Sequence, residues 1–530
     1  MSIPKSTRPW RQVRPRVPFA ALAMGLAGVL ALPVLPCVQA ATQAGVPVLS
    51  CAHAAAQEPV DLEMIERIRT EAKEGSQVLE LYNTLTNVIG PRLSGSPAYD
   101  RSADWAREWL DGIGLTDARL EAFEFGRGWT LEKLSLEMTS PRYLSLLGYA
   151  EAWTPSTAGR IEGRPHSVGD RTREEIEALG PDLEGAIVLT HHPQTVFTRA
   201  DRPQPTESEE PVRTGAPARA PGETGSSETP LNQMRTVLAD AGAGVLLRPS
   251  RGEHGTVYVL GNRNTPDDAV PSVVLAAEHY NMIVRLLEAG EPVELAVEVG
   301  TRYHEDDPES HNVLADLPGN DPEIGHEVVL IGGHLDSWHT GTGATDNADG
   351  IAVAMEAMRI LRALDAEPRR TIRVALWGGE EQGLLGSRAY VEDHLEGPGN
   401  EDAHEALSVY LNDDPGAGFT YGWYMEENQA AREIFDAWLE PLRELGARRN
   451  VFEGIPSTDH LSFTRVGIPA FTAIKDYTNY DTRTHHTNAD LFERVVEEEL
   501  IQAAIVLAVF AWHAAQRDER IPRDGRDSGP

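Results

Sequence analysis

Apolar runs alternate with amphipathic stretches from about residue 303 to residue 516. Short apolar runs predict buried strands, and apolar residues at helical spacing predict helices that pack against them. The predicted strands span 328–333, 371–377 and 407–411, and the predicted helices span 350–364, 383–394 and a long stretch within 491–516. Strands that alternate with helices form a mostly parallel sheet covered on both faces. We therefore predict an α/β fold, a mostly parallel mixed sheet flanked by helices, whose second part spans 301–516.

The preceding half of the chain has two other patterns. Helical periodicity covers much of 56–135, with a turn-rich break from Gly90 to Ser96, and we assign this region to the first part of the same domain. Between 136 and 300 the pattern changes to short strands separated by turns, as in Ala186–Thr190 and Gly244–Leu247. This change predicts that 136–300 forms a smaller inserted β-rich domain.

Two segments have compositions that disfavour an ordered structure. Residues 200–230 consist mainly of Pro, Glu, Gly, Ser, Thr and Arg, which bury too little apolar surface to offset the entropy of ordering. We predict a flexible surface loop there. The last residues, 517–530, are polar, and we predict a disordered tail.

The N-terminus has the pattern of a secretory signal. Five basic residues and no acidic residue precede an uncharged apolar stretch that begins at Val17, and Val38-Gln39-Ala40 has the small residues of a cleavage site. An uncleaved membrane anchor is the alternative, because the stretch is long enough to span a bilayer. Pro33 and Pro36 favour cleavage. We predict a signal peptide over 1–40 and a secreted or periplasmic protein that leaves the membrane.

Charge and cysteine content exclude several classes of partner. The net charge of the 530-residue chain is −35, which disfavours nucleic acids and anionic membranes as partners because both would be repelled. Cleavage after Ala40 would remove Cys37 and leave Cys51 as the one cysteine. An internal disulfide and cysteine ligation of a metal cluster are therefore both excluded.

Candidate chemistry lies where the predicted strands end. His334 and Asp336 close the first apolar run two residues apart, a spacing that places both side chains on one side of a strand. An acid beside a ligating imidazole can hold its second ring nitrogen. By themselves, a histidine and an aspartate at this spacing are weak evidence for a metal site, since a structural histidine gives the same pattern. Its position gives it weight, because ligands in open parallel sheets bind beyond the carboxyl ends of the strands.

Further carboxylates follow the same strand ends. Asp346 and Asp349 precede an apolar helix, and Asp349 is the better candidate for its cap, which leaves Asp346 to bridge two cations. Glu380 and Glu381 follow the second strand, and consecutive side chains on a strand end diverge, so the two would act differently. One can bind a cation while the other acts on the water that the cation activates. A solvated acidic turn is the alternative interpretation.

Two more ligand positions stay open at this point. The third strand runs into Asp413-Asp414, and His485-His486 precedes the last helix. Spacing alone allows either member of each pair to bind a cation. Asp490 either caps the last helix or supports the histidine.

These residues together resemble the zinc exopeptidase family that includes aminopeptidase Y and, more closely, carboxypeptidase Q. The resemblance covers about residues 60–520 and rests on the segments Gly333–Trp338, Arg369–Trp377 with Glu380–Gly383, and His485–Thr487. It implies two Zn²⁺ per chain, a peptide or dipeptide substrate, and an inserted domain like a protease-associated domain, which in relatives shapes access to the cleft or aids homodimer formation. It also makes 56–135 and 301–516 the two parts of one catalytic domain.

The resemblance assigns a role to each candidate residue. One zinc would be held by His334 and Asp414 and the other by Glu381 and His486, with Asp346 as the bridge, Glu380 as general base and Asp336 orienting His334. The choice of Asp414 over Asp413 and of His486 over His485 comes from the family pattern alone.

Several alternatives remain beside this assignment. The turn after Trp338 carries His339 where the relatives resemble an aspartate, Gly378-Gly379 replaces a bulkier pair, and Thr458-Asp459-His460 resembles the aminopeptidase branch. These departures leave substrate-binding residues and the choice between carboxypeptidase, dipeptidase and aminopeptidase open. Arg483 either pairs with a substrate carboxylate or is simply exposed.

Other protein classes fit the residues less well. A second two-zinc family inserts its lid domain between the fourth and fifth ligands, whereas here the extra domain precedes His334. A metal-free receptor with the same fold, or a single-zinc glutaminyl cyclase, is disfavoured because no ligand of the set is missing.

Overall fold

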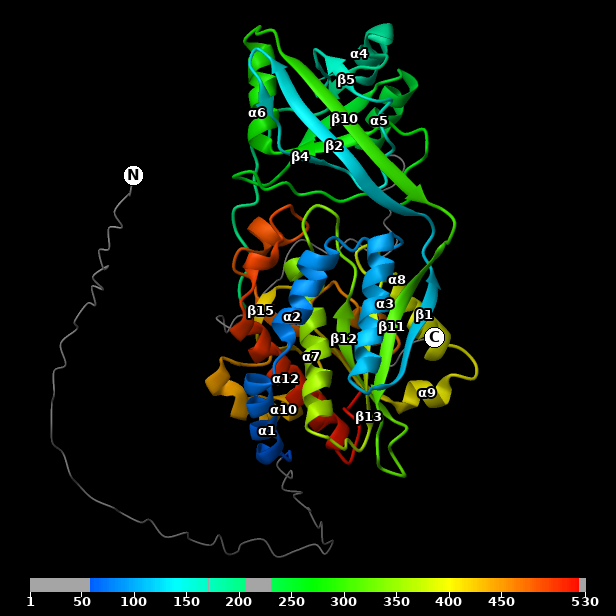
Figure 1. Cartoon of the computed structure of the whole chain (residues 1–530), viewed down its shortest axis with the longest axis vertical. Coiled ribbons are helices and arrows are strands. Elements are labelled where there is room, and N and C mark those ends of the chain that lie inside the picture. The colour runs from blue at the N-terminus through cyan, green and yellow to red at the C-terminus, as the bar shows by residue number, and fades with distance from the viewer. Residues whose placement is uncertain (1–57, 170, 206–229, 524–530) are drawn as a thin grey trace, which may run out of the picture. The chain divides into compact units, whose positions relative to one another are not determined.

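The predicted strands form the centre of a seven-stranded sheet in the computed structural model (Figure 1), which describes residues 58–169, 171–205 and 230–523. The order of the strands is β1-β11-β13-β12-β14-β16-β15. Their bounds are Thr116–Glu124 (β1), Glu309–Leu317 (β11), Val328–His334 (β12), Thr371–Trp377 (β13), Leu407–Asn412 (β14), Ala417–Tyr424 (β15) and Ala470–Asp476 (β16). The predicted signal peptide over 1–40 and most of the predicted loop, 206–229, lie outside the described residues.

The sheet is mixed, as predicted, but less parallel than the alternating pattern suggested. The neighbours β13, β12, β14 and β16 run parallel, whereas β1, β11 and β15 pair antiparallel with their neighbours. β11 and β13 are separated in the chain by β12 and a helix, so their antiparallel pairing is a long-range contact that periodicity does not reveal. The four parallel strands place the ends of β12, β13 and β14 at one edge of the sheet.

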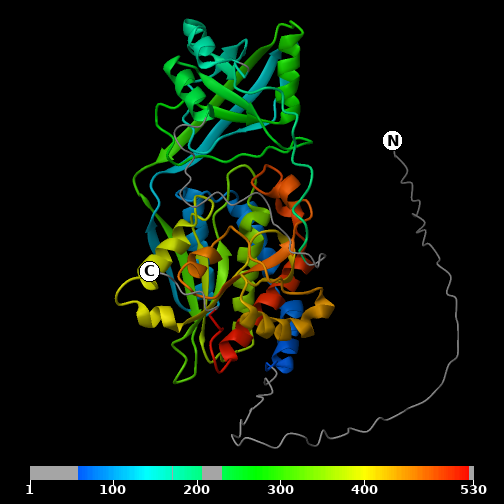
Figure 2. The ribbon, with the colours of Figure 1, turned by 180° about the vertical axis from the view of Figure 1, so that it is seen from behind.

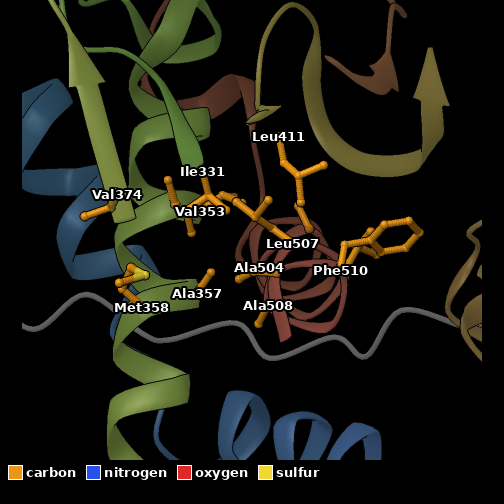
Figure 3. Close-up of a cluster of buried hydrophobic side chains, with 14 of the residues drawn as sticks. Ile331, Val353, Ala357, Met358, Val374, Leu411, Ala504, Leu507, Ala508 and Phe510 are labelled. Atoms are coloured by element: carbon orange, nitrogen blue, oxygen red, sulfur yellow. The ribbon is translucent and has the colours of Figure 1, made fainter. Parts of the chain in front are cut away.

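Helices cover both faces of the sheet, which confirms the predicted layers. On one face α7 (Asp349–Ala363) and α12 (Glu497–Gln516) pack against β12, and Ile331, Val353, Leu411 and Leu507 belong to the shared core (Figure 3). The helices α1 (Leu62–Glu74), α2 (Val78–Asn83), α3 (Pro97–Gly112) and α10 (Gln429–Leu439) contribute side chains to the same core. On the other face, visible from behind in Figure 2, α8 (Leu385–His394) and α11 (His460–Thr464) bury Trp377, Tyr410 and Phe463. A short helix, α9 (Glu401–Ala406), precedes β14.

The helix α12 is the one described helix that is long and apolar enough to cross a membrane. Of its most apolar window, 83% is buried inside the protein. Its residues from Ala503 to Ala511 are at most 1% exposed and pack against α7 and β12. The apolar composition of α12 is therefore explained by its place in the core.

The segment between β1 and β11 forms two sheets of its own. One sheet has the order β3-β2-β10-β5 and the other has the order β4-β9-β8-β7-β6. The bounds are Gly128–Ser140 (β2), Leu144–Ser145 (β3), Gly148–Ala150 (β4), Ile161–Gly163 (β5), His166–Ser167 (β6), Ile187–Leu189 (β7), Val245–Pro249 (β8), Ser272–Leu275 (β9) and Glu294–His304 (β10), with helices Arg173–Glu177 (α4), Pro230–Asp240 (α5) and Ala277–Glu288 (α6). We call residues 128–304 the inserted segment. The predicted boundaries at 136 and 300 fall inside β2 and β10, because these strands continue past the first change in pattern.

The C-terminal prediction differs from the structure for residues 517–523. Ile521 is 2% exposed, Arg517 pairs with Glu58, and Arg370 donates a hydrogen bond to the carbonyl of Asp518. Polar side chains of residues 517–523 thus make ion pairs and hydrogen bonds with other parts of the described chain. Residues 524–530 lie outside the described part of the chain.

Candidate metal centre

The end of β12 places two buried polar side chains at the sheet edge. His334 and Asp336 are 1% and 0% exposed. Their position depends on close approach of the backbone, since a Cβ atom on Gly333 would lie 2.7 Å from the carbonyl oxygen of Asp413. The Nδ1 atom of His334 is 3.0 Å from the carbonyl oxygen of Asp336, a hydrogen bond that leaves Nε2 directed elsewhere.

Nε2 of His334 faces two carboxylates. It lies 3.2 Å from Oδ1 of Asp346 and 3.7 Å from Oδ1 of Asp414, and ligand atoms of these three residues all lie within 4.8 Å of one another. The three come from the end of β12, the turn before α7 and the end of β14. Residues far apart in the sequence thus meet at one sheet edge, as the parallel strand ends predict.

A second histidine faces the other oxygen of the same aspartate. Nε2 of His486 lies 3.2 Å from Oδ2 of Asp346 and 2.9 Å from Oε2 of Glu381. Asp346 therefore lies between two imidazoles, with one carboxylate oxygen directed to each. This arrangement is the one that a carboxylate bridging two cations would need.

Asp413 and Asp414 have different partners in the structure. Oδ1 of Asp413 lies 2.6 Å from Nζ of Lys475, whose side chain is fully buried and also lies 3.1 Å from Asp349. Asp414 is instead directed to His334. Asp349, predicted as a helix cap, makes this buried ion pair and accepts hydrogen bonds from the backbone of Gly350 and Gly418.

The two histidines before α12 also differ in their contacts. His485 stacks on Tyr480 with ring centroids 4.9 Å apart, and its Nδ1 atom lies 3.9 Å from Asp481. A ligand atom of His485 is also within 4.8 Å of Asp346 and His486. His486 is nevertheless the better ligand candidate, because its Nε2 atom contacts Glu381 as well as Asp346.

Comparison with known proteins agrees with this geometry. Residues 312–511 match the model of peptidase family M28, and this match includes all seven predicted site residues. This part of the chain is therefore similar to the peptidases of family M28. The chain is 27% identical over 443 residues to carboxypeptidase Q of Bos taurus, an alignment that covers 83% of this chain and 85% of that protein.

Solved structures share the fold of this chain. A peptidase M28 precursor from Shewanella amazonensis has a TM-score of 0.64 at 24% identity, covering 88% of this chain and 99% of that one. A zinc aminopeptidase from Bacillus subtilis has a TM-score of 0.56 at 19% identity, covering 84% of this chain and 95% of that one.

The acidic pair Glu380-Glu381 lies in a turn and not on a strand end, because β13 ends at Trp377 and Gly379 has φ +68°. The carboxylate of Asp336 accepts hydrogen bonds from the backbone N–H groups of Glu380 at 3.2 Å and Glu381 at 3.3 Å. Its Oδ1 atom is also 3.5 Å from Nδ1 of His334. Asp336 thus connects the histidine to both glutamates.

Sequence reasoning missed a buried arginine beneath the site. Arg92 is 0% exposed and donates hydrogen bonds to five backbone carbonyls, those of Leu85, Gly90, Leu335, Thr342 and Gly343. It thereby fixes the loop that connects His334 to Asp346. The sequence shows Arg92 only as part of a turn-rich break, since the carbonyls of Leu335, Thr342 and Gly343 come from a distant segment and leave no local signal.

Two further residues support the ligands. Oδ1 of Asp490 accepts hydrogen bonds from the backbone N–H and the hydroxyl of Thr345, both at 2.8 Å, so Asp490 holds the turn that carries Asp346 and does not cap α12, which begins at Glu497. Nε1 of Trp338 donates to Oε2 of Glu381 at 2.6 Å.

Burial and mutual repulsion govern protonation in the site. Burial by itself would lower the pKa of His334, but the carboxylates of Asp414 and Glu380 outweigh it and raise this pKa well above its ordinary value. Burial and the neighbouring Asp346 raise the pKa of Glu381 to about 7. Burial likewise raises the pKa of Glu380 well above its ordinary value. Carboxylates gathered in this way ionise readily only beside positive charge, which divalent cations would supply.

The hydrogen bonding of the carboxylates also fits cations. Oδ2 of Asp346, Oε1 of Glu381 and Oδ1 of Asp414 are buried and accept no hydrogen bond from the described residues. Buried carboxylate oxygens without hydrogen bonds are costly and rare in folded proteins. Together with two imidazole nitrogens, these oxygens form a donor set that zinc prefers.

Proposed function

We propose that this protein is a secreted two-zinc exopeptidase that hydrolyses dipeptides or short peptides. The observation that carries the proposal is the position of Asp346, whose two carboxylate oxygens lie 3.2 Å from Nε2 of His334 and 3.2 Å from Nε2 of His486. A single bridging carboxylate between two imidazoles fits a pair of cations better than it fits one. Residues 312–511 match a peptidase family, which supports a peptide substrate.

The ligands divide into two sets that share Asp346. His334 and Asp414 would hold one zinc ion, and Glu381 and His486 would hold the other. When bound, the zinc pair would lower the pKa of a water molecule toward about 7 and stabilise negative charge on the oxygen of the scissile carbonyl.

The chain itself supplies the proton transfer. Glu380 is the one acid of the adjacent pair that makes no contact with His486, and the hydrogen bond from its backbone N–H to Asp336 fixes its position. We assign Glu380 as the general base that takes the proton from the attacking water and delivers it to the leaving amine. Asp336 positions both Glu380 and His334, so its removal would disturb base and ligand together.

The terminus that the enzyme recognises is a second question. The Nη1 atom of Arg483 donates to the carbonyl of Glu253 at 2.9 Å and to the hydroxyl of Thr256 at 3.0 Å, so this atom holds the loop before His486 and is not directed to a substrate carboxylate. Carboxypeptidase Q of Bos taurus is 27% identical to this chain, and the structural neighbours include a zinc aminopeptidase that is 19% identical. We favour carboxypeptidase or dipeptidase action, with aminopeptidase action as the alternative.

A substrate panel with and without a chelator tests the proposal. Dipeptides, N-blocked dipeptides and amino-acid anilides would be offered to the purified full-length protein, with product amino acids quantified by chromatography. We expect cleavage of dipeptides and loss of all activity after metal removal, restored by zinc. Cleavage of anilides would support the aminopeptidase alternative, and cleavage of N-blocked dipeptides would support carboxypeptidase action. Activity that survives complete metal removal would refute the mechanism.

A further inference from the structure

The inserted segment contacts the loop that carries His486. Tyr258 forms an antiparallel β-bridge with Thr487, and the backbone N–H of Val259 donates to the carbonyl of His486 at 3.2 Å. The backbone N–H of Val257 donates to the side-chain oxygen of Asn488 at 2.7 Å. The backbone on both sides of the histidine is thus bonded to a segment outside the seven-stranded sheet.

The side chain of His486 is held by the same segment. The hydroxyl of Tyr258 lies 3.1 Å from Nδ1 of His486, on the opposite side of the ring from the Nε2 atom that faces Glu381. The guanidinium of Arg251 lies 3.6 Å above the ring of Tyr258, a cation–π contact that holds the tyrosine in place. These contacts connect the inserted segment through Tyr258 and His486 to Glu381.

The backbone of His486 requires such support. Its φ is +60°, in the left-handed region, where a non-glycine residue persists only when its surroundings hold it there. The side chains of two arginines also fix the same loop. Arg202 pairs with Asp481 at 2.6 Å, and Arg483 donates to Glu253 and Thr256.

The two histidines therefore differ in what orients them. Nδ1 of His334 bonds to the carbonyl oxygen of Asp336, two residues away on the catalytic core, and the carboxylate of Asp336 lies nearby. Nδ1 of His486 bonds to a residue that belongs to the inserted segment. Groups that bond the second nitrogen of a ligating histidine fix its tautomer and orientation, and their loss weakens metal binding by about 10- to 100-fold.

We propose that Tyr258 is a positioning residue for His486, and that the inserted segment is thereby a working part of one of the two metal sites. With a cation at Nε2, the N–H of Nδ1 would donate to the tyrosine hydroxyl. The inference rests on the proposed function, because it requires a metal at His486. It predicts that a change in the inserted segment alters one metal ion and spares the other.

The test is stepwise zinc binding by the Tyr258→Phe variant, measured by competition with a chromophoric chelator. This variant keeps the ring and its contact with Arg251 but lacks the hydroxyl. We expect one zinc ion to bind about 10- to 100-fold more weakly and the other to bind as in the wild type. The visible spectrum of the cobalt-substituted protein should change as well, since the orientation of one imidazole changes.

Two further variants make the result specific. Tyr143→Phe removes a hydroxyl from the same segment at a side chain that is 69% exposed, and it should bind both ions like the wild type. Arg251→Gln should weaken the same ion as Tyr258→Phe by about two- to five-fold, because it frees the tyrosine ring. If the Tyr258→Phe protein binds both ions with wild-type affinity, the inference is wrong. If the wild type binds no zinc at all, the proposed function fails first.

Discussion

Replacement of Glu380 by glutamine is expected to lower kcat by about 10²- to 10⁴-fold, the range that a general base contributes. Glutamine has nearly the same shape but cannot accept the proton of the attacking water. Asp336 would still accept the backbone N–H of residue 380, so the turn and the ligands should stay in place. Both zinc ions should therefore remain bound in the inactive variant.

Steady-state kinetics with a cleaved dipeptide, together with zinc analysis by mass spectrometry, check this expectation. Glu392→Gln is a matched control, because Glu392 is exposed on α8 and should retain full activity and metal. Retained turnover in the Glu380 variant would place the general base elsewhere. Loss of zinc along with activity would instead make Glu380 a ligand.

Replacement of Asp346 by asparagine should also lower activity strongly, but because the variant binds zinc less well. Asparagine is neutral and has a single amide oxygen, whereas Asp346 directs one carboxylate oxygen to each of His334 and His486. The variant should hold fewer than two zinc ions per chain. Without the second ion the transition state loses several kcal/mol of stabilisation. We therefore expect kcat/KM to fall on the order of 10³-fold.

Zinc content and kcat/KM, measured on the same preparation, check this second expectation. Asp365→Asn, at a side chain that is 91% exposed, serves as the control and should match the wild type. An Asp346→Asn protein with two zinc ions and normal kcat/KM would show that Asp346 does not bridge the two ions.

The parts of the fold that follow local patterns could be predicted from the sequence. The strands β12, β13 and β14 are short apolar runs, and β12 ends at His334 itself, while β13 and β14 end shortly before Glu381 and Asp414. Parallel strands end at one edge, so His334, Glu381 and Asp414 were expected to meet. Their contacts in the structure agree with that expectation.

Other features depend on partners that are distant in the sequence. Spacing could not show which of Asp413 and Asp414 is the metal ligand, because Asp413 is bound by Lys475, some sixty positions away. The antiparallel outer strands, and the contacts of Arg92 with the carbonyls of Leu335, Thr342 and Gly343, are long-range in the same sense. The contact of Tyr258 with His486 crosses from the inserted segment to the catalytic core, and no local pattern indicates it.

Direct location of zinc tests the central claim, that five side chains at one sheet edge hold a pair of cations. Crystals of the purified protein would be measured at wavelengths above and below the zinc absorption edge. We expect two anomalous peaks, one within about 2.1 Å of Nε2 of His334 and one within about 2.1 Å of Nε2 of His486, with Asp346 between them. A protein that binds no zinc, or binds it away from these histidines, would contradict the account.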